Sequence, residues 1–346
     1  MSQTISASAT QPGSATALRP IAELHVHVEG TLEVELMVKL ARRNGIVLPT
    51  YDADVLREKY KFDSLQSFLD IYYENLAVLK TEDDFYDLAT AYLTRAAAAG
   101  VRHAEIFFDP QTHLLNDIPI EVVFGGFSAA LGDARTNLDV SSGLIMCFLR
   151  DQGADAAMQT LEQALPFRDS FIGVGLDSAE VGFPPSLFTD VFARASAEGL
   201  RRVAHAGEEG GPDYVWEALD LLGVERIDHG NRALEDPYLV ARLRDEQIPL
   251  TVCPLSNVAL RTASSDLSQH PLLNMLDEGL LVTINSDDPA YFGGYIDDNL
   301  TAMTEALDLS PAQLDTLAEN SFTASFLPEA DKIRYTAEVS KYRAER

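Results

Sequence analysis

The stretch ELHVHVEG, residues 23–30, places two histidines one residue apart within an apolar run. In a β-strand alternate side chains lie on the same face, so His25 and His27 project together and the apolar residues around them project oppositely. If the apolar face packs on a hydrophobic layer, the other face holds two adjacent imidazoles, which suits a metal, an anion or water. A chance pair on an exposed strand has the same pattern, so this stretch alone does not establish a metal site.

Further residues suited to metal binding or acid–base chemistry follow later strand-like runs. They are Glu180, His205, Glu208, His229, Asp287 and Asp288. Imidazole nitrogens and carboxylate oxygens are ligands that Zn²⁺ takes. Each motif is weak by itself, because a lone histidine is often a hydrogen-bonded core residue and Ser-Asp-Asp-Pro is an ordinary turn. Their joint occurrence at the ends of several strands favours a metalloenzyme, whereas we expect His103, His113 and His270 to be structural or surface residues.

Eight short β-rich runs alternate with helical patterns from residue 21 onward. The predicted strands cover residues 21–28, 101–108, 142–149, 171–178, 201–207, 224–230, 249–256 and 280–286. Strand–helix alternation repeated eight times in this length predicts an α/β fold of the (β/α)8 barrel type rather than an open sheet. Because the carboxyl ends of barrel strands meet at one mouth, Asp287 on the last strand is expected beside the histidines of the first.

Extra helices are predicted at two places in the barrel. Residues 29–100 are too long for one helix and contain at least three helical patterns, including 64–79 and 83–99. Because this segment follows the first strand, on the face where barrels build active sites, we predict a partial lid over a pocket. Two or three helices follow the eighth strand, one of them with Ser310 as N-cap and Pro311 at its first position.

Composition limits the classes of partner. The chain has 346 residues, 46% of them hydrophobic, and a formal net charge of −28, which argues against nucleic acid or anionic membrane because phosphates recruit basic surfaces. Cys147 and Cys253 lie in apolar runs without metal-ligand spacing, so we expect buried free thiols in a reducing compartment. Residues 1–20 lack signal-peptide features and are expected to be a flexible tail before a single domain, residues 21–346. No apolar run approaches a membrane span, so a soluble cytoplasmic protein is expected.

Five motifs occur in order on the predicted strands one, five, six, seven and eight: HVHVEGT, HAGE, HG at 229–230, CPLSN and SDDP. Together they resemble the adenosine/adenine deaminase family of metal-dependent hydrolases, and the resemblance covers nearly everything from residue 21 onward. The segments FFDPQTH, GLDSAEVGFPP and FLDIYYENLAVL are similar to the adenine deaminase branch. Val28 stands where the family commonly has Leu, but its side chain faces away from the metal.

The resemblance implies one Zn²⁺ ion held by His25, His27, His205 and Asp287. Zinc lowers the pKa of a bound water from about 16 to about 7. The resemblance further implies that Glu208 donates a proton to purine N1, that His229 orients the attacking water and takes up its proton, and that Asp288 hydrogen-bonds the ring at N7. The expected reaction converts adenine to hypoxanthine and ammonia, in purine salvage or nitrogen release. It requires a protonated Glu208 near pH 7, and burial in the pocket would raise its pKa accordingly.

Glu180 stands where the adenosine-acting branch has a glycine in our alignment. A carboxylate there would accept a hydrogen bond from N9–H of free adenine or, when protonated, donate to N3. It would also clash with the ribose of a nucleoside and so select the free base. A surface glutamate following the strand is the alternative interpretation.

Three other functions stay open from the sequence. The substrate is adenosine or an N6-substituted adenine if the lid leaves a roomier pocket. A non-catalytic binding protein on the same barrel is a second possibility, although the intact set of chemical residues argues against it. A metal-dependent hydrolase of esters or lactones is a third, but such relatives commonly use a carboxylated lysine, and no predicted strand end offers a lysine.

Overall fold

The computed structural model describes residues 18–346 except residue 63, and its centre is a sheet of eight parallel strands. The strands are β1 (Ile21–His27), β2 (Val101–Phe108), β3 (Ser141–Leu149), β4 (Gly173–Asp177), β5 (Arg201–Ala206), β6 (Arg226–His229), β7 (Leu250–Val252) and β8 (Val282–Ile284). Each strand pairs in parallel with the next along the chain.

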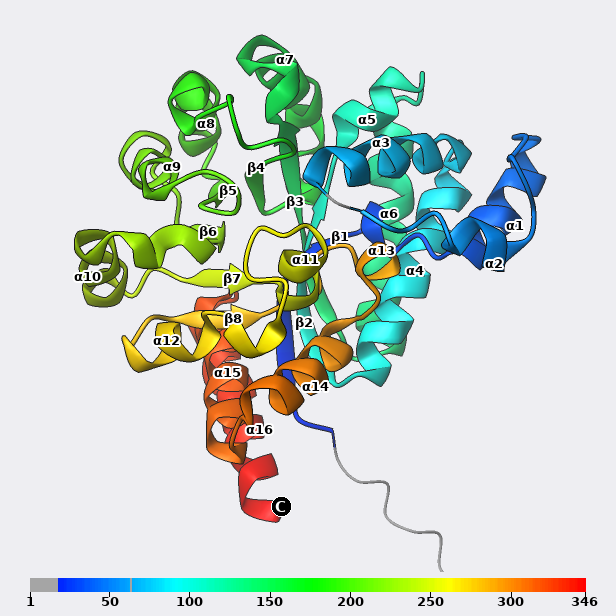
Figure 1. Ribbon diagram of the computed structural model, residues 1–346. Helices are drawn as coiled ribbons and strands as arrows, with labels where there is room; N and C mark the ends of the chain where they lie inside the picture. The colour runs from blue at the N-terminus through cyan, green and yellow to red at the C-terminus, as the bar shows by residue number, and fades with distance from the viewer. Residues whose placement is uncertain (1–17, 63) are drawn as a thin grey trace, which may run out of the picture.

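Hydrogen bonds between β1 and the residues after β8 close the sheet. The amide of His27 donates to the carbonyl of Asp287 at 2.9 Å, and the amide of Asp287 donates to the carbonyl of His25 at 3.1 Å. The predicted (β/α)8 barrel is therefore confirmed, and Figure 1 shows its helices arranged around the strands.

The helices follow the strands, and they are most numerous between β1 and β2 and after β8. The α-helices are α1 (Val34–Asn44), α2 (Ala53–Arg57), α3 (Leu65–Asn75), α4 (Glu82–Ala98), α5 (Pro110–Leu115), α6 (Ile120–Asn137), α7 (Ala154–Ala164), α8 (Thr189–Ala197), α9 (Pro212–Glu217), α10 (Pro237–Glu246), α11 (Pro254–Ala259), α12 (Leu272–Asp277), α13 (Pro289–Phe292), α14 (Ile296–Leu307), α15 (Pro311–Ala324) and α16 (Glu329–Glu345). The α15 helix begins as predicted, because the Ser310 hydroxyl accepts from the Gln313 amide at 3.3 Å and Pro311 occupies the first position.

Alternation along β1 places its polar and apolar side chains in different layers. The rings of His25 and His27 lie on one side, with their centroids 5.6 Å apart. Leu24 belongs instead to a buried apolar cluster with Phe322 of α15, and Val26 belongs to the main core between strands and helices. The apolar layer predicted behind the two histidines is therefore present.

The α3 helix lies over the pocket at the C-terminal ends of the strands. Its side chains Leu65, Phe68, Leu69, Tyr72 and Tyr73 line that pocket. The segment between β1 and β2 thus covers the barrel mouth as predicted.

The N-terminal tail and the absence of a membrane span were also predicted. The tail predicted for residues 1–20 falls mostly outside the described residues. Within the described part of the chain, no helix has both the length and the apolar character that crossing a membrane requires.

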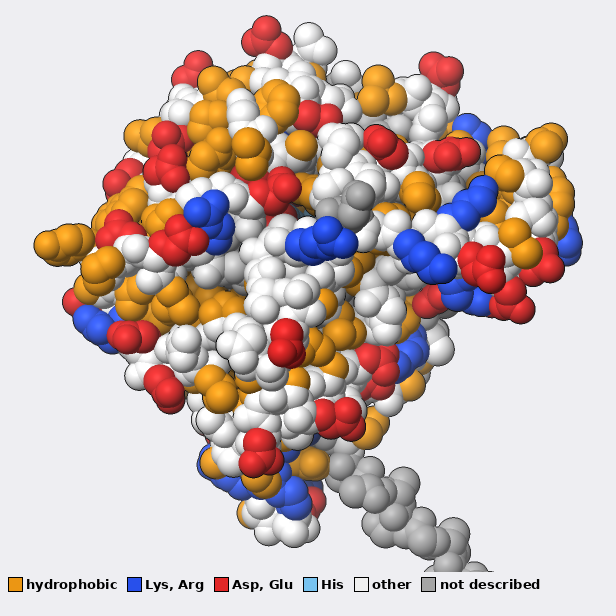
Figure 2. Space-filling view, viewed as in Figure 1, with side chains coloured by type: hydrophobic (Ala, Val, Ile, Leu, Met, Phe, Trp, Pro, Cys, Tyr) orange, Lys and Arg blue, Asp and Glu red, His pale blue; other side chains and the backbone are white. Residues whose placement is uncertain are grey.

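Figure 2 shows acidic side chains spread over the viewed face rather than gathered in one patch, which accords with the charge of −28.

Candidate active site

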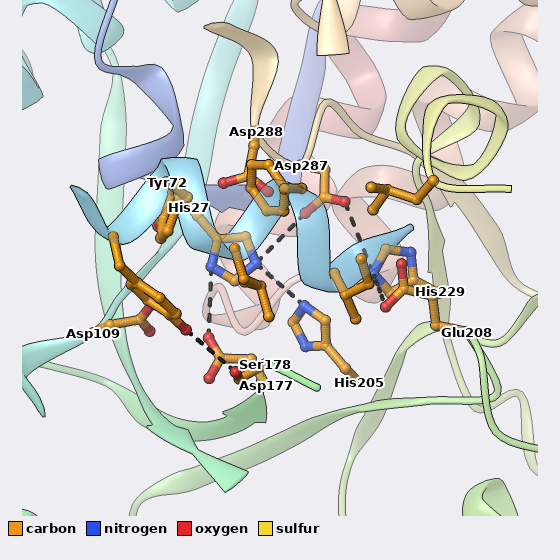
Figure 3. A pocket seen from close by; sticks show the side chains of 15 residues that line it. His27, Tyr72, Asp109, Asp177, Ser178, His205, Glu208, His229, Asp287 and Asp288 are labelled. Atoms are coloured by element: carbon orange, nitrogen blue, oxygen red, sulfur yellow. Dashed lines mark hydrogen bonds and ion pairs between the residues drawn. The ribbon is translucent and has the colours of Figure 1, made fainter. Parts of the chain in front are cut away.

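A cavity that is partly open to solvent lies at the C-terminal ends of the strands. One side of its lining is apolar and aromatic and comes mainly from α3. The other side is polar and titratable and comes from β1, β4, β5, β6 and the residues that follow β2 and β8 (Figure 3). A few polar groups converging in a mostly apolar hollow are typical of a small-molecule site.

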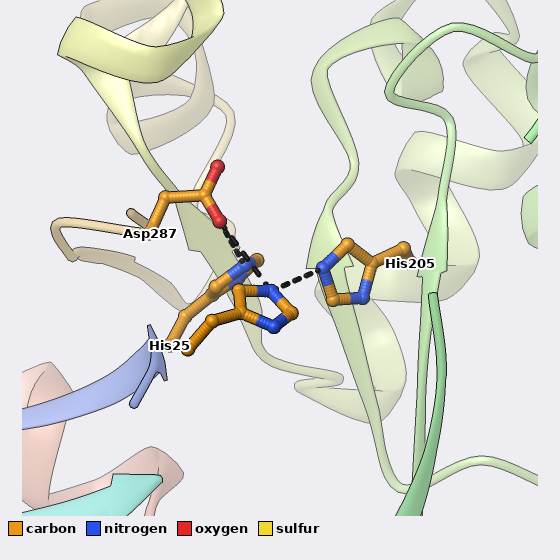
Figure 4. Close-up of side chains that lie close together, drawn as sticks. His25, His205 and Asp287 are labelled. Atoms are coloured by element: carbon orange, nitrogen blue, oxygen red, sulfur yellow. Dashed lines mark hydrogen bonds and ion pairs between the residues drawn. The ribbon is translucent and has the colours of Figure 1, made fainter. Parts of the chain in front are cut away.

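The four predicted metal ligands converge at the floor of this cavity. Each of His25, His27, His205 and Asp287 offers one ligand atom, and these atoms all lie within 4.8 Å of one another. The Nε2 atoms of His27 and His205 are 3.2 Å apart. Asp287 Oδ1 lies 3.2 Å from His25 Nε2 and 3.5 Å from His27 Nε2, and Figure 4 shows the carboxylate turned toward the rings.

Burial keeps two histidines of this cluster, His27 and His205, neutral. It lowers the pKa of His27 to about 4, with the neighbouring His25 adding to the effect. It also lowers the pKa of His205 well below its ordinary value, again together with His25. Burial acts to raise the pKa of Asp287, but the neighbouring histidines, His25 most strongly, outweigh it and leave that pKa well below the usual range. The cluster therefore presents imidazole lone pairs and an ionised carboxylate.

The donor set fits a bound zinc ion. Three imidazoles and one carboxylate around a single point are nitrogen and oxygen ligands of the kind zinc takes. A second possible group contains Cys253, but burial raises the pKa of its thiol well above the ordinary value. Since the thiolate is the form that binds metals, the histidine–aspartate group is the better site.

Hydrogen bonds behind the cluster fix the orientation of its members. The Thr251 hydroxyl donates to Asp228 Oδ1 at 2.9 Å, so its oxygen is left to accept from His25 Nδ1, which is also 2.9 Å away. With its proton on Nδ1, His25 turns the lone pair of Nε2 toward the cluster. The Ser256 hydroxyl donates to Asp287 Oδ2 at 2.6 Å and holds that carboxylate in place.

Glu208 and His229 lie beside the cluster and close to each other. Glu208 Oε2 is 3.6 Å from His229 Nε2, which is 3.9 Å from Asp287 Oδ2. Burial, with the charges of Asp287 and Glu180, raises the pKa of Glu208 well above its ordinary value. Burial lowers the pKa of His229 to about 3. Asn257 Nδ2 lies 3.2 Å from His229 Nδ1, and donation from that amide places the ring proton on Nε2.

Turns at the strand ends bring another predicted residue, Asp288, to the cavity wall. Asp287, His229 and Ser178 adopt left-handed backbone conformations, with φ of 64°, 64° and 69°, a strain typical of functional sites. Asp288 lies against Gly30 so closely that a Cβ on the glycine would come within 2.0 Å of Asp288 Oδ1. The glycine of HVHVEG therefore leaves space for this carboxyl group. Burial and the adjacent Asp287 raise the pKa of Asp288 well above its usual range.

Glu180 does not lie where the base-selection hypothesis needs it. Its side chain is buried, and both carboxylate oxygens accept hydrogen bonds from the backbone amides of residues 207–210. It is not among the residues that line the cavity. A carboxylate held in this way by four amides is directed at the protein backbone and not at a purine.

Two aspartates to which the sequence assigned no role line the cavity wall beyond His27. Asp177 ends β4 and Asp109 follows β2, and their carboxylates group with His27 within 4.8 Å. Burial raises the pKa of Asp177 to about 7, and burial together with Asp177 raises the pKa of Asp109 well above its usual range. Asp109 directly follows a predicted strand, as Asp287 does, and Asp177 lies near the end of another, and these positions were the available signal.

The three histidines predicted to be structural take part in other contacts. His113 is buried, and its Nε2 lies 2.9 Å from Glu29 Oε1. His103 contacts Glu105, and His270 packs near Asn257. Among the described residues, none of the three belongs to a group that could hold a metal ion.

The comparison with known proteins agrees with this geometry. A model of the family described as adenosine deaminase matches residues 20–342. The chain therefore belongs to the adenosine deaminase family, as the motifs indicated. An adenine deaminase of Streptomyces coelicolor is 60% identical over 335 residues, which are 96% of this chain and 98% of that protein.

Solved structures are also similar to the chain. The crystal structure of adenine deaminase from Arthrobacter aurescens has a TM-score of 0.93 and 53% sequence identity, covering 94% of this chain and 99% of the other. An amidohydrolase from Burkholderia ambifaria with bound Zn has a TM-score of 0.85 and 28% identity, covering 94% of this chain and 92% of the other.

Proposed function

We propose that this chain is an adenine deaminase that hydrolyses adenine to hypoxanthine and ammonia. The observation that carries the proposal is the buried cluster of three histidines and one aspartate beside Glu208, whose pKa burial raises, at the pocket in the barrel mouth. The choice of adenine rests on the near full-length likeness to proteins named adenine deaminase. The proposal places the activity in a single domain, residues 21–346, of a cytoplasmic protein that acts in purine salvage or nitrogen release.

One zinc ion per chain is proposed to bind His25, His27, His205 and Asp287. Zinc bound there supplies Lewis acidity, which makes water acidic enough to act as a nucleophile near neutral pH. The neutral state of His27 and His205 and the ionised state of Asp287 are the states that such binding requires.

Glu208 is proposed to act as the general acid. With its raised pKa it holds a proton on a carboxyl oxygen at neutral pH and donates that proton to purine N1. Protonation of N1 draws electron density from C6, the carbon that carries the leaving amino group. The oxygen of water forms a bond to C6, one water proton passes to the amino nitrogen, and the other restores the proton of Glu208. The bond between C6 and the amino nitrogen then breaks, and ammonia leaves.

His229 and Asp288 are proposed to orient the reacting groups. With its proton on Nε2, His229 donates a hydrogen bond that orients the attacking water, whereas the predicted uptake of a proton by this ring requires the other tautomer. Asp288 has a raised pKa and so keeps an O–H that can donate to N7, which is only an acceptor in adenine. The aromatic side chains of α3 exclude bulk water from above.

The test is a purine panel combined with metal analysis of the purified protein. We expect ammonia release from adenine, slow or no release from adenosine and N6-methyladenine, and one zinc ion per chain. In His205→Ala, zinc content and turnover should both be lost. Zinc-loaded protein that releases no ammonia from adenine would overturn the proposed substrate, and turnover of adenosine or N6-methyladenine instead would support one of the alternatives.

A further inference from the structure

The turn that follows β5 is held by an unusual internal anion. Residues 207–210 connect β5 to the start of α9 and include Glu208. Their four successive backbone N–H groups point at one buried carboxylate, that of Glu180, at 2.8, 3.1, 2.7 and 2.8 Å in chain order. Successive amides that converge in this way form a concave anion-binding nest, and here the anion comes from the chain itself.

The close approach depends on small residues in the turn. Gly207 has a φ of +69°, which few other residues adopt without strain. A Cβ on Gly210 would lie 2.8 Å from Glu180 Oε1 and 2.7 Å from the ring of Tyr214. A side chain at position 210 would therefore push the carboxylate and the turn apart.

The turn is tied to the barrel by further contacts on its other side. The amide of Arg232 donates to the carbonyl of Gly207 at 2.9 Å, and its guanidinium donates to the carbonyl of Glu209 at 2.8 Å. These bonds hold two carbonyls of the turn, whereas Glu180 holds all four of its amides. Without Glu180 these amides would be left without their partner in a region that water reaches poorly.

We propose that Glu180 is a positioning residue, whose carboxylate fixes the turn of residues 207–210 and thereby aims the side chain of Glu208 into the pocket. The inference rests on the proposed function, because it assumes that Glu208 delivers a proton to the substrate. It replaces the hypothesis that Glu180 contacts N9 of the purine. Glu180 acts through Glu208 and does not touch the substrate.

Two substitutions disturb this arrangement from opposite sides. Glu180→Gln keeps the size of the side chain but loses the charge and turns an amide N–H toward backbone donors. Gly210→Ala keeps the charge but forces the carboxylate and the turn apart. Because a small misplacement of a catalytic group costs roughly 100-fold in rate, we expect kcat for adenine to fall about 100-fold in both, with KM nearly unchanged.

The dependence of kcat on pH separates positioning from a general loss of structure. The negative charge of Glu180 contributes to the raised pKa of Glu208. In Glu180→Gln that contribution is gone, so the alkaline limb of the kcat profile should move to lower pH. In Gly210→Ala the charge remains, so the limb should stay near its wild-type position while kcat falls.

A matched control is Glu217→Gln on α9. Glu217 also accepts a backbone N–H bond, from Ser186 at 2.9 Å, but it lies outside the turn and the cavity lining. We expect wild-type kcat, KM and pH profile in this variant. Zinc content and the unfolding midpoint are measured for every variant, and kcat is expressed per folded, zinc-loaded molecule.

The outcomes distinguish the inference from its alternatives. Wild-type kcat and an unmoved alkaline limb in Glu180→Gln, with adenine turned over normally by the parent, would overturn the positioning role and leave the proposed function intact. A rise in KM for adenine with a gain of adenosine turnover would instead support direct contact with the substrate and overturn it. A kcat that returns to the wild-type value once corrected for folded protein would show a structural role only. Failure of the parent itself on adenine would count against the proposed function.

Discussion

The surroundings of Glu208 determine whether its carboxyl group donates or accepts a proton. Burial raises its pKa, so the neutral acid is the form present in the pocket. We predict that Glu208→Gln, which cannot release a proton to N1, lowers kcat for adenine about 10²- to 10⁴-fold. Ammonia release under saturating adenine measures the effect, with Glu217→Gln as control. Zinc content should not change, and a variant that retains more than a tenth of the parent kcat would argue against the acid role.

The same raised pKa predicts the pH dependence of the parent enzyme. Since the protonated acid is the active form, kcat should stay constant at pH values below the pKa of Glu208 and fall as the pH rises through it. An ordinary glutamic acid would already be ionised above a pH of about 4.5. We therefore expect an alkaline limb well above that pH in a plot of kcat against pH. The limb should be absent from the residual activity of Glu208→Gln.

Gly30 is predicted to matter because of the space it leaves for Asp288. A methyl group at position 30 would overlap the Asp288 carboxyl group and displace it from the cavity wall. Loss of its hydrogen bond to the purine should lower kcat/KM for adenine about tenfold, equivalent to about 1.4 kcal/mol. Steady-state kinetics measures this loss, and Gly132→Ala is the matched control because nothing lies within 4 Å of a Cβ there. Unchanged kcat/KM in Gly30→Ala would contradict the assigned contact.

At the scale of elements, the lid helix α3 is fastened to the short helix α13 that follows Asp288. Asn75, at the end of α3, donates from Nδ2 to the hydroxyls of Tyr60 at 3.0 Å and Tyr291 at 3.1 Å. The Tyr60 and Tyr291 rings stack with their centroids 4.6 Å apart. The cover of the pocket and the residue proposed to bind N7 therefore share one anchored unit.

Asn75→Ala should loosen this lid without touching the metal cluster. Losing two hydrogen bonds weakens the closed arrangement by about 1–3 kcal/mol. We expect KM for adenine to rise about tenfold and the amides of α3 to exchange hydrogen faster, with zinc content unchanged. The control is Gln66→Ala on the outer face of the same helix, where the amide only reaches Asp70 at 2.9 Å. Equal exchange in both variants would show that the Asn75 contacts do not hold the lid.

Periodicity predicted every strand of the barrel but not every boundary. The seventh run was predicted over 249–256, whereas β7 ends at Val252. Pro254 opens the α11 helix there, and an apolar run continuing through CPLS cannot by itself distinguish a strand from a short helix. The sequence of residues 212–223 predicts one amphipathic helix, whereas the structure has α9 followed by a π-helical turn, Ala218–Leu222. The hydrogen-bond spacing within a helix has no signature in composition.

The metal cluster could be predicted because each of its members ends or follows a strand, and barrel closure brings strand ends together. The hydrogen bonds of Glu180 could not be predicted from the sequence. Its partners are backbone amides, which almost every residue has, so no sequence motif marks them. The pair Asp109 and Asp177 stood in motifs that resembled the family, but only the folded pocket shows that their carboxylates face the same space.

At the scale of the whole molecule, the candidate metal site brings together side chains from strands that are not neighbours in the sheet, such as β1 and β5. Two ligands lie on β1, the third follows β8 across the closing seam, and His205 comes from β5 on the opposite side. A bound ion would therefore link opposite walls of the barrel. The ligands are far apart in the chain, so the unfolded state has no preformed site, and binding free energy adds to folding free energy.

Removal of the metal is therefore predicted to lower the stability of the whole barrel. Zinc at about 100 times its dissociation constant adds about 2.7 kcal/mol to the free energy of unfolding, which corresponds to several degrees in the midpoint of a chain this size. Thermal unfolding of the parent with and without a chelator should show this drop, and added zinc should reverse it. His205→Ala is the control, because it should unfold near the midpoint of the chelated parent and respond little to chelator or zinc. Equal midpoints for loaded and chelated parent protein, with zinc loss verified by elemental analysis, would show that the ion does not link the barrel walls.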